Sequence, residues 1–242
     1  MPIFSRAAGV PEPVIVDGVT YIKSDWMQTV AAADLSPTVF LVEQPPNVSL
    51  RTHFHRQNQF QLFVRGDGTI GRHRLQALMV HYAGAYSAYG PLMSGPRGLA
   101  YFTLRTVFEK GSLTMTHNPE TMQRGPKRQL HSAPVTLPDA ASLAGRTAIE
   151  VDDLIAPQAD GSAATLYTLP PNTRVGGTEP AGSAGQFYVV VSGHLIAGEA
   201  LRRTWESIFV APGESGFEMI AGDEGAQVVC LQLPPRAGEY RI

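Results

Sequence analysis

The stretch from Thr52 to Gly66, THFHRQNQFQLFVRG, determines the fold that this sequence predicts. Its first histidines, His53 and His55, are separated by one residue. Successive side chains of a strand point to opposite faces, so both imidazoles point to one side, about 6.5 Å apart. A polar break follows, and an alternating run over residues 59–65 leads into a glycine turn. The stretch therefore predicts a hairpin with a polar pocket at one end.

The landmarks of this stretch occur twice. The matching pairs are Pro45-Pro46-Asn47 with Pro170-Pro171-Asn172, Gln59-Phe60 with Gln186-Phe187, and Gly66 with Gly193. Their shared order indicates a tandem repeat of one supersecondary unit. Each copy ends in an apolar strand, at residues 99–104 and 227–233. A polar segment with prolines, residues 117–138, separates the copies and predicts domains at residues 1–135 and 136–242.

Composition narrows the class of protein. Of the 242 residues, 43% are apolar and only 17% charged, and 24 are glycine and 19 proline, which favours strands and loops over long helices. The net charge of −2 gives no reason to expect a nucleic-acid or membrane partner. Neither a signal-peptide pattern nor an apolar stretch of membrane-spanning length is present, so we expect a cytoplasmic protein.

Three local expectations follow from the remaining sequence. The single cysteine, Cys230, lies in an apolar run and is predicted to be a core residue. Residues 24–35 are predicted to form a short helix with Ser24 as its N-cap. Residues 1–14 look like an extended arm that could pair with the sheet edge of a second copy, so we expect a homodimer.

The first copy resembles the first motif of the cupin family, which is His-x-His, an acidic residue four positions later, and a glycine. Here the motif is His53, His55, Gln59 in place of the usual glutamate, and Gly66. The second copy keeps the glutamine and glycine but has residues 178–182 where the histidines would stand. The resemblance implies an all-β fold of two tandem antiparallel β-barrels (double-stranded β-helix, or jelly roll) with few short helices. The second barrel of this bicupin would be degenerate.

For function, the resemblance implies that His53 and His55 bind a divalent metal ion such as iron, manganese, zinc or nickel. The chain would then be a metal-dependent enzyme of the dioxygenase, decarboxylase or isomerase type. A metal-free ligand-binding or sensory protein and a purely structural module are the alternatives. The motif lacks the carboxylate that an iron site prefers, and Glu43, His73 and His81 are the other candidates for ligands.

A small-molecule pocket is predicted beside the histidines. Alternation places Gln59, Gln61 and Phe63 on the inner face, and Tyr89 and His81 come from the following segments. The second copy keeps Gln186 without any histidine pair, so this glutamine position is expected to form hydrogen bonds rather than to bind metal. Residues 66–71 match G-x-G-x-x-G but lack the acidic residue that a dinucleotide site needs, so no nucleotide cofactor is expected.

Overall fold

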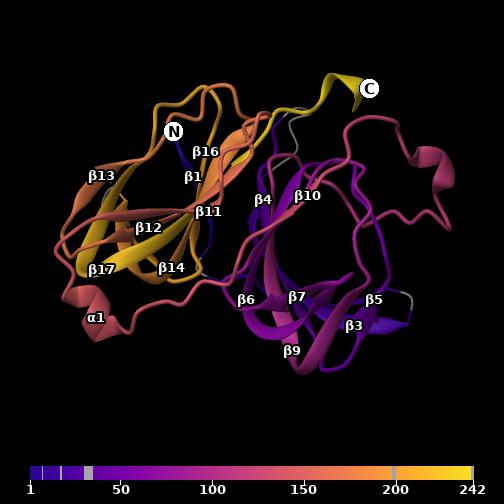
Figure 1. The fold of residues 1–242 in the computed structure, drawn as a ribbon, viewed down its shortest axis with the longest axis horizontal. Helices are drawn as coiled ribbons and strands as arrows, with labels where there is room; N and C mark the ends of the chain where they lie inside the picture. The colour runs from indigo at the N-terminus through magenta and orange to yellow at the C-terminus, as the bar shows by residue number, and fades with distance from the viewer. Residues whose placement is uncertain (7, 17, 30–34, 198–199, 241–242) are drawn as a thin grey trace. The chain divides into compact units, whose positions relative to one another are not determined.

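The computed structural model describes residues 1–6, 8–16, 18–29, 35–197 and 200–240. The chain forms two compact units (Figure 1). The first barrel comprises Ala8–Val135 with Arg236–Ile242, and the second comprises Met1–Ala7 with Thr136–Pro235. The two terminal segments therefore differ from the expectation: residues 1–7 belong to the second barrel and residues 236–242 to the first.

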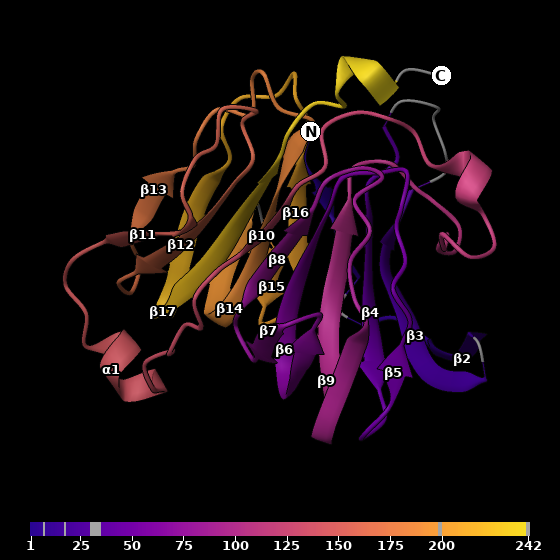
Figure 2. The same ribbon diagram turned by 45° about the vertical axis from the view of Figure 1, so that its right-hand side comes forward.

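The first barrel is built on a nine-stranded antiparallel sheet with the order β10-β8-β6-β9-β4-β3-β2, in which β7 pairs with β6 and β5 with β9. Its long central strands, β6, β9 and β4, lie side by side (Figure 2). The strands are β2 (Pro11–Val16), β3 (Val19–Gln28), β4 (Thr38–Gln44), β5 (Ser49–Leu50), β6 (Gln59–Ile70), β7 (His73–Gln76), β8 (Val80–Ala83), β9 (Leu92–Arg105) and β10 (Gln129–His131).

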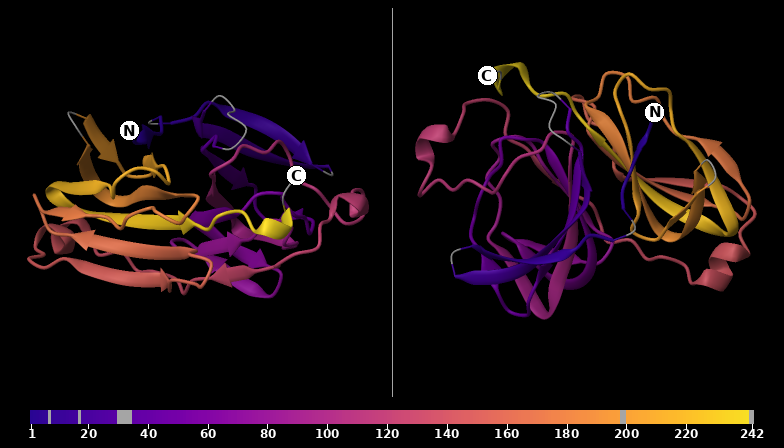
Figure 3. Two further views of the ribbon diagram at one scale, coloured as in Figure 1. Left: turned by 90° about the horizontal axis from the view of Figure 1, so that it is seen from above. Right: turned by 180° about the vertical axis from the view of Figure 1, so that it is seen from behind.

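The second barrel is built on an eight-stranded sheet with the order β1-β16-β14-β17-β12-β11, in which β13 pairs with β17 and β15 with β14. Its longest strands, orange β14 and yellow β17, are neighbours (Figure 3). The strands are β1 (Ile3–Phe4), β11 (Glu150–Ile155), β12 (Ala163–Leu169), β13 (Arg174–Gly176), β14 (Gly185–Ala197), β15 (Ala200–Arg203), β16 (Ser207–Val210) and β17 (Glu218–Leu233).

Helices are few and short, and the all-β prediction is confirmed. Among the described residues they are α1 (Ala140–Ala144) and two 3-10 helices, Pro119–Thr121 and Gly238–Tyr240. Asp139 caps α1 by accepting a hydrogen bond from the Ser142 backbone N–H at 2.7 Å. No helix in these parts of the chain is both long and apolar enough to span a bilayer.

The sequence repeat corresponds to a structural repeat. Gly66 and Gly193 have φ of 81° and 68°, and Asn47 and Asn172 both have φ of 57°. A Cβ on Gly66 would lie 2.0 Å from the Gly98 carbonyl oxygen, and one on Gly193 would lie 2.2 Å from that of Gly225. Only glycine combines this φ with such a close approach of the neighbouring strand. The landmark residues are therefore required by the backbone geometry of each barrel.

The predicted helix at residues 24–35 is wrong over residues 24–28, and residues 30–34 lie outside the described parts. Residues 24–28 continue β3 and pair with β4, and Ser24 also pairs with Pro11 of β2. Trp26 also packs edge-on against Phe102, with ring centroids 5.1 Å apart. Pairing with a long neighbouring strand satisfies the backbone more completely than a short isolated helix would.

The N-terminal arm pairs within the chain. Ile3 and Phe4 pair with Phe209 and Ile208 of β16, and β2 pairs with β3. Both strands lie at the edge of their sheets, so each uses one side for pairing inside the chain. The homodimer stays a prediction.

Candidate functional site

A cavity of about 370 Å³ lies inside the first barrel. Its lining comes from strands β2, β3, β4, β6 and β9, from Tyr89, and from the segments 50–55 and 108–114. Most lining side chains are apolar or aromatic, and the polar and charged ones are Lys23, Thr38, Arg51, His53, His55, Gln61, Thr103, Arg105, Glu109, Lys110, Ser112 and Thr114. A few polar groups in a mostly apolar cavity are typical of small-molecule sites.

The histidine segment is held between two other segments. His53 exchanges two backbone hydrogen bonds with Tyr89, at 3.1 and 2.9 Å, and Phe54 exchanges two with Leu113, at 2.8 and 3.0 Å. Phe54 is fully buried on the other side, against Tyr86 and Tyr240. Anchoring Phe54 there turns both histidines toward the cavity, as the alternation predicted, with ring centroids 5.4 Å apart.

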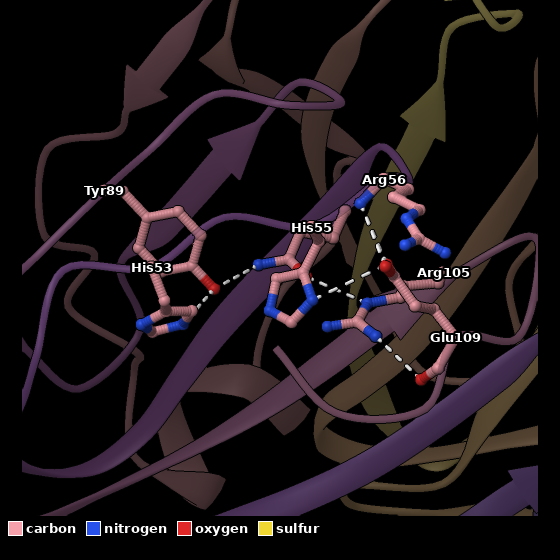
Figure 4. A network of polar contacts seen from close by, with 7 residues as sticks. His53, His55, Arg56, Tyr89, Arg105 and Glu109 are labelled. Atoms are coloured by element: carbon pink, nitrogen blue, oxygen red, sulfur yellow. Dashed lines mark hydrogen bonds and ion pairs between the residues drawn. The ribbon is translucent and has the colours of Figure 1, made fainter. Parts of the chain in front are cut away.

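His53 ends a directional chain of hydrogen bonds (Figure 4). Arg105 Nε donates to Gln59 Oε1 at 2.9 Å, and Gln59 Nε2 donates to the Tyr89 hydroxyl at 2.6 Å. Tyr89 Oη lies 2.9 Å from His53 Nε2. His53 Nδ1 lies 2.8 Å from the Arg51 carbonyl oxygen, which can only accept, so Nδ1 carries the proton. Nε2 is then the acceptor of the Tyr89 hydroxyl proton.

His55 faces Glu109. Its Nδ1 lies 3.6 Å from Glu109 Oε2, too far for a hydrogen bond, and both Glu109 carboxylate oxygens accept from the Arg56 backbone N–H, at 3.1 and 3.0 Å. Burial, and next the charge of Arg105, holds the pKa of His55 well below its usual range. The two groups therefore do not form an ion pair at neutral pH, when His55 is uncharged.

Burial dominates the electrostatics of the site. It lowers the pKa of His53, and it raises the pKa of Tyr89 to about 12 and that of Glu109 in spite of the nearby Arg105 charge. Both histidines are thus neutral near pH 7, and the phenol stays protonated. The positive charge at this end of the cavity comes from Arg105.

The predicted site residues divide into two layers. His53, His55, Gln61 and Tyr89 line the cavity. Gln59, Phe63 and His81 are not among the lining residues and lie behind them, where they contact Tyr89, Tyr101 and Gln61 respectively. Glu43 instead forms an ion pair with Arg65.

Arg105 and Glu109 were not among the predicted site residues. A signal for Arg105 was present, because it continues the alternation of Tyr101 and Thr103 along one face of β9, and all three line the cavity. Glu109 follows β9 in an irregular segment, where periodicity gives no information about side-chain direction. Only the folded backbone brings it beside His55.

The metal site predicted from His53 and His55 stays a prediction. Among the described residues, no group of three or more His, Cys, Asp or Glu side chains could hold a metal ion. Each ring nitrogen of His53 already has a hydrogen-bond partner within the protein. A metal ion at Nε2 would have to displace the Tyr89 hydroxyl, since a metal ligand needs a free lone pair.

The second barrel fills the equivalent positions. Strand pairing matches Gln61, Tyr101 and Thr103 of the first barrel with Tyr188, Val228 and Cys230 of the second. These three belong to the apolar core of the second barrel, so the prediction that Cys230 is a core residue is confirmed. Gln186 forms hydrogen bonds to Thr178 and Gln232 at 2.9 and 2.8 Å, which is the role expected of this glutamine position.

Comparisons with known proteins identify the fold. No protein-family model and no curated protein matches the sequence. Among solved structures, Escherichia coli pirin in complex with nickel(II) has a TM-score of 0.56 at 11% identity, over 97% of this chain and 100% of that one. The formate complex of Lactobacillus farciminis oxalate decarboxylase has a TM-score of 0.57 at 10% identity, over 94% and 85%.

Bacillus subtilis oxalate decarboxylase, described with Mn(II) centres, has a TM-score of 0.56 at 10% identity, over 98% of this chain and 78% of that one. At these identities the likeness is one of fold. The likeness supports a cupin fold, as the resemblance implied. Its particular form here is a two-barrel arrangement, with a cavity in the first barrel and an apolar core cluster in the second.

Proposed function

We propose that the first barrel binds a small organic molecule in its cavity without a resident metal ion. The contrast between two copies of one fold carries the proposal. The second barrel fills positions 188, 228 and 230 with core side chains, whereas their first-barrel equivalents border a cavity. Unfilled space destabilises a protein, and this fold can avoid it, so the cavity is better explained by a ligand than by folding.

The polar groups of the cavity are already ordered for binding. Hydrogen bonds hold His53, Tyr89 and Arg105 in place, and a volume of about 370 Å³ lies in the usual range for small-molecule sites. Side chains that are ordered in advance lose little entropy when a ligand enters. This arrangement favours binding of one kind of molecule in one orientation.

A metal-dependent enzyme is the second candidate. It is favoured by the positions of His53, His55 and Glu109 beside the same cavity, and by the nickel and manganese described for the structural neighbours. It requires that His53 Nε2 exchange the Tyr89 hydroxyl for the ion.

Metal analysis separates the two candidates. The protein is prepared without chelator or nickel column, incubated with excess ferrous, manganous, zinc or nickel ions, desalted and analysed. We expect less than about 0.1 ion per chain and an unchanged melting temperature, because the histidine donors are not arranged for an ion. Retention of about one ion by the wild type, lost in H53A/H55A but kept in the exposed control H117A, would establish the metal-dependent reading instead.

A further inference from the structure

The guanidinium of Arg105 is a buried charge, and the Glu109 carboxylate interacts with it without direct contact. The side chain is 3% exposed. It donates to Gln59 Oε1 at 2.9 Å and to the Glu109 backbone oxygen at 3.3 Å, and it lies over the Phe40 ring, 5.5 Å from its centroid. Within the described parts of the chain, no carboxylate forms an ion pair with it. Neutral acceptors compensate only part of the cost of burying a charge.

The fold does not require a cation at this position. Phe60 pairs with Leu104 in the first barrel as Phe187 pairs with Leu231 in the second, so the residue after each leucine is equivalent, Arg105 in one and Gln232 in the other. Gln232 also bonds the matching glutamine, accepting from Gln186 Nε2 at 2.8 Å. A neutral amide therefore serves the second barrel where the first has a guanidinium. The charge is explained by the cavity rather than by the barrel.

The cavity as a whole favours an anion. Its lining contains one acidic side chain, Glu109, against the cationic side chains of Lys23, Arg51, Arg105 and Lys110. Lys23 pairs with Asp25 at 2.6 Å, and the Glu109 carboxylate is held by the Arg56 backbone. Both histidines that line the cavity are neutral near pH 7. Arg105 and Lys110 therefore supply positive charge at the cavity, which attracts a negatively charged group.

The apolar side chains of the cavity determine what the rest of the ligand can be. Apolar side chains of the lining include Val14, Val16, Phe40, Val42, Leu50 and Phe108. These side chains offer no charge or strong hydrogen bond, so they favour an apolar body. A carboxylate matches the planar fork of a guanidinium in shape as well as charge.

We propose that the cavity is specific for a monocarboxylic acid with an aromatic or branched aliphatic body, its carboxylate bound by Arg105 and its body packed against β2 and β4. This inference rests on the proposed function of the first barrel as a small-molecule site. It adds the chemical class of the ligand and the residue that selects it.

The test uses the full chain with benzoate and phenylacetate as probes, benzamide and phenylacetamide as their neutral matches, and isothermal titration calorimetry. We expect each acid to bind at least about tenfold more tightly than its amide, because the amide cannot form the charge-assisted pair. R105Q, which places the second barrel's residue at this position, should fold with a similar circular dichroism spectrum and lose about tenfold or more in acid affinity. R105K should keep part of the affinity, and inorganic phosphate should not compete.

Equal binding of acid and amide, unchanged acid binding by R105Q, effective competition by phosphate, or no binding of either acid would overturn the inference. If R105Q does not fold, the acid-to-amide ratios of the wild type and R105K decide the question. The metal analysis tests the proposed function separately. Tight binding of the amides by metal-free protein would leave that function standing while refuting the carboxylate class.

Discussion

The direction of every hydrogen bond between Arg105 and His53 is fixed by the two groups at the ends of the chain of bonds. The guanidinium can only donate, and the Arg51 carbonyl can only accept. Between these two groups lie Gln59, Tyr89 and His53. Each of them accepts a hydrogen bond from the residue before it and donates one to the group after it. Protonating His53 would give it a second donor toward Tyr89, which already accepts from Gln59. The chain of bonds thus favours the neutral imidazole, as burial does.

Removing the Tyr89 hydroxyl should destabilise the protein. Y89F leaves Gln59 Nε2 and His53 Nε2 without their partner in a buried place, so we expect a loss of about 1–3 kcal/mol in the free energy of unfolding, measured by urea denaturation. Y101F is the matched control, because the Tyr101 hydroxyl has no hydrogen bond to the described residues. Equal losses in the two variants would contradict the directional chain.

The sequence predicted part of the site and missed the residue that carries its charge. Alternation placed both histidines on one side, and the repeat showed that Gln59 bonds its neighbours. The same alternation did not show that Gln59 lies behind Tyr89, because that depends on a phenol 30 residues away. Arg105 escaped notice for a related reason. Periodicity gives the face of a strand, whereas the absence of an ion pair with any described carboxylate is a property of the folded neighbourhood.

Three histidines stack across the strands at one edge of the nine-stranded sheet. His73 of β7 lies 3.9 Å from His131 of β10, and His131 lies 4.6 Å from His81 of β8, as ring centroids. Burial, and then the neighbouring imidazoles, lowers the pKa of His81 well below its usual range and that of His131 to about 4. His81 also bonds Gln61, which lines the cavity, at 2.8 Å. Stacked imidazoles are compatible with the fold only while they remain neutral.

Acid should therefore destabilise the first barrel. In the unfolded chain His81 and His131 titrate near pH 6.5, so from about pH 6.5 down to about pH 4 the unfolded state binds protons that the folded state does not. The free energy of unfolding then falls as the pH falls through this window, by at most about 1.4 kcal/mol per pH unit for the buried His81. Urea midpoints at pH 7 and pH 5 measure this change.

H131Q should show a smaller loss of stability than the wild type between these two pH values, and H117Q, at an exposed histidine outside the stack, should match the wild type. Glu109 acts in the opposite sense, because burial raises its pKa, but it lies at the cavity and is unchanged in these variants. An H131Q protein with the wild-type pH dependence would show that the stack does not titrate as described.

Strands β6 and β14 each contain a glycine with a positive φ, Gly66 and Gly193. G66A should lower the free energy of unfolding by about 2–3 kcal/mol, since alanine is strained at φ of 81° and meets the Gly98 carbonyl. G193A should behave alike in the second barrel. G213A is the control, because nothing lies within 4 Å of a Cβ there, and we expect a change below about 0.5 kcal/mol. Thermal and urea unfolding provide the measurement.

Strand β3 shows where sequence reasoning fails for a whole element. Residues 24–28 carry a suitable N-cap and no strong alternation, so local propensity favoured a helix. The structure pairs them with β4, and this backbone pairing decides the conformation. Elements with their own landmarks, such as β6 and β14, were predictable because the chain repeats them. The sequence shows no repeated landmark for β3, so its predicted conformation could not be compared with a second copy.

At the scale of the molecule, each barrel is completed by a terminal segment from the far end of the chain. Tyr240 is 2% exposed, packs on Tyr86 with ring centroids 4.8 Å apart, and donates its hydroxyl proton to the Pro126 carbonyl at 2.6 Å. It thereby covers the cluster that contains Phe54, between the two site histidines. The support behind the histidine segment thus comes partly from the C-terminal segment.

Y240A should destabilise the first barrel by about 2–4 kcal/mol, because it opens a cavity beside Phe54 and Tyr86. Y240F keeps the ring and loses only the hydroxyl bonds to Pro126 and Lys127, so its free energy of unfolding should fall by only about 1 kcal/mol. Chemical denaturation monitored by circular dichroism compares them. A Y240A protein as stable as the wild type would show that residues 236–242 do not support the barrel.

This exchange of terminal segments has a consequence for biosynthesis. A ribosome delivers residues 8–135 early, yet the first barrel receives Tyr240 only when residue 240 has been made. The second barrel needs Ile3 and Phe4, which cannot pair until β16 emerges roughly 200 residues later. The first barrel therefore waits for a segment made after the second barrel's strands. The nascent chain must keep Ile3 and Phe4 available until β16 has been made, so the two barrels reach their final form late and close together in time.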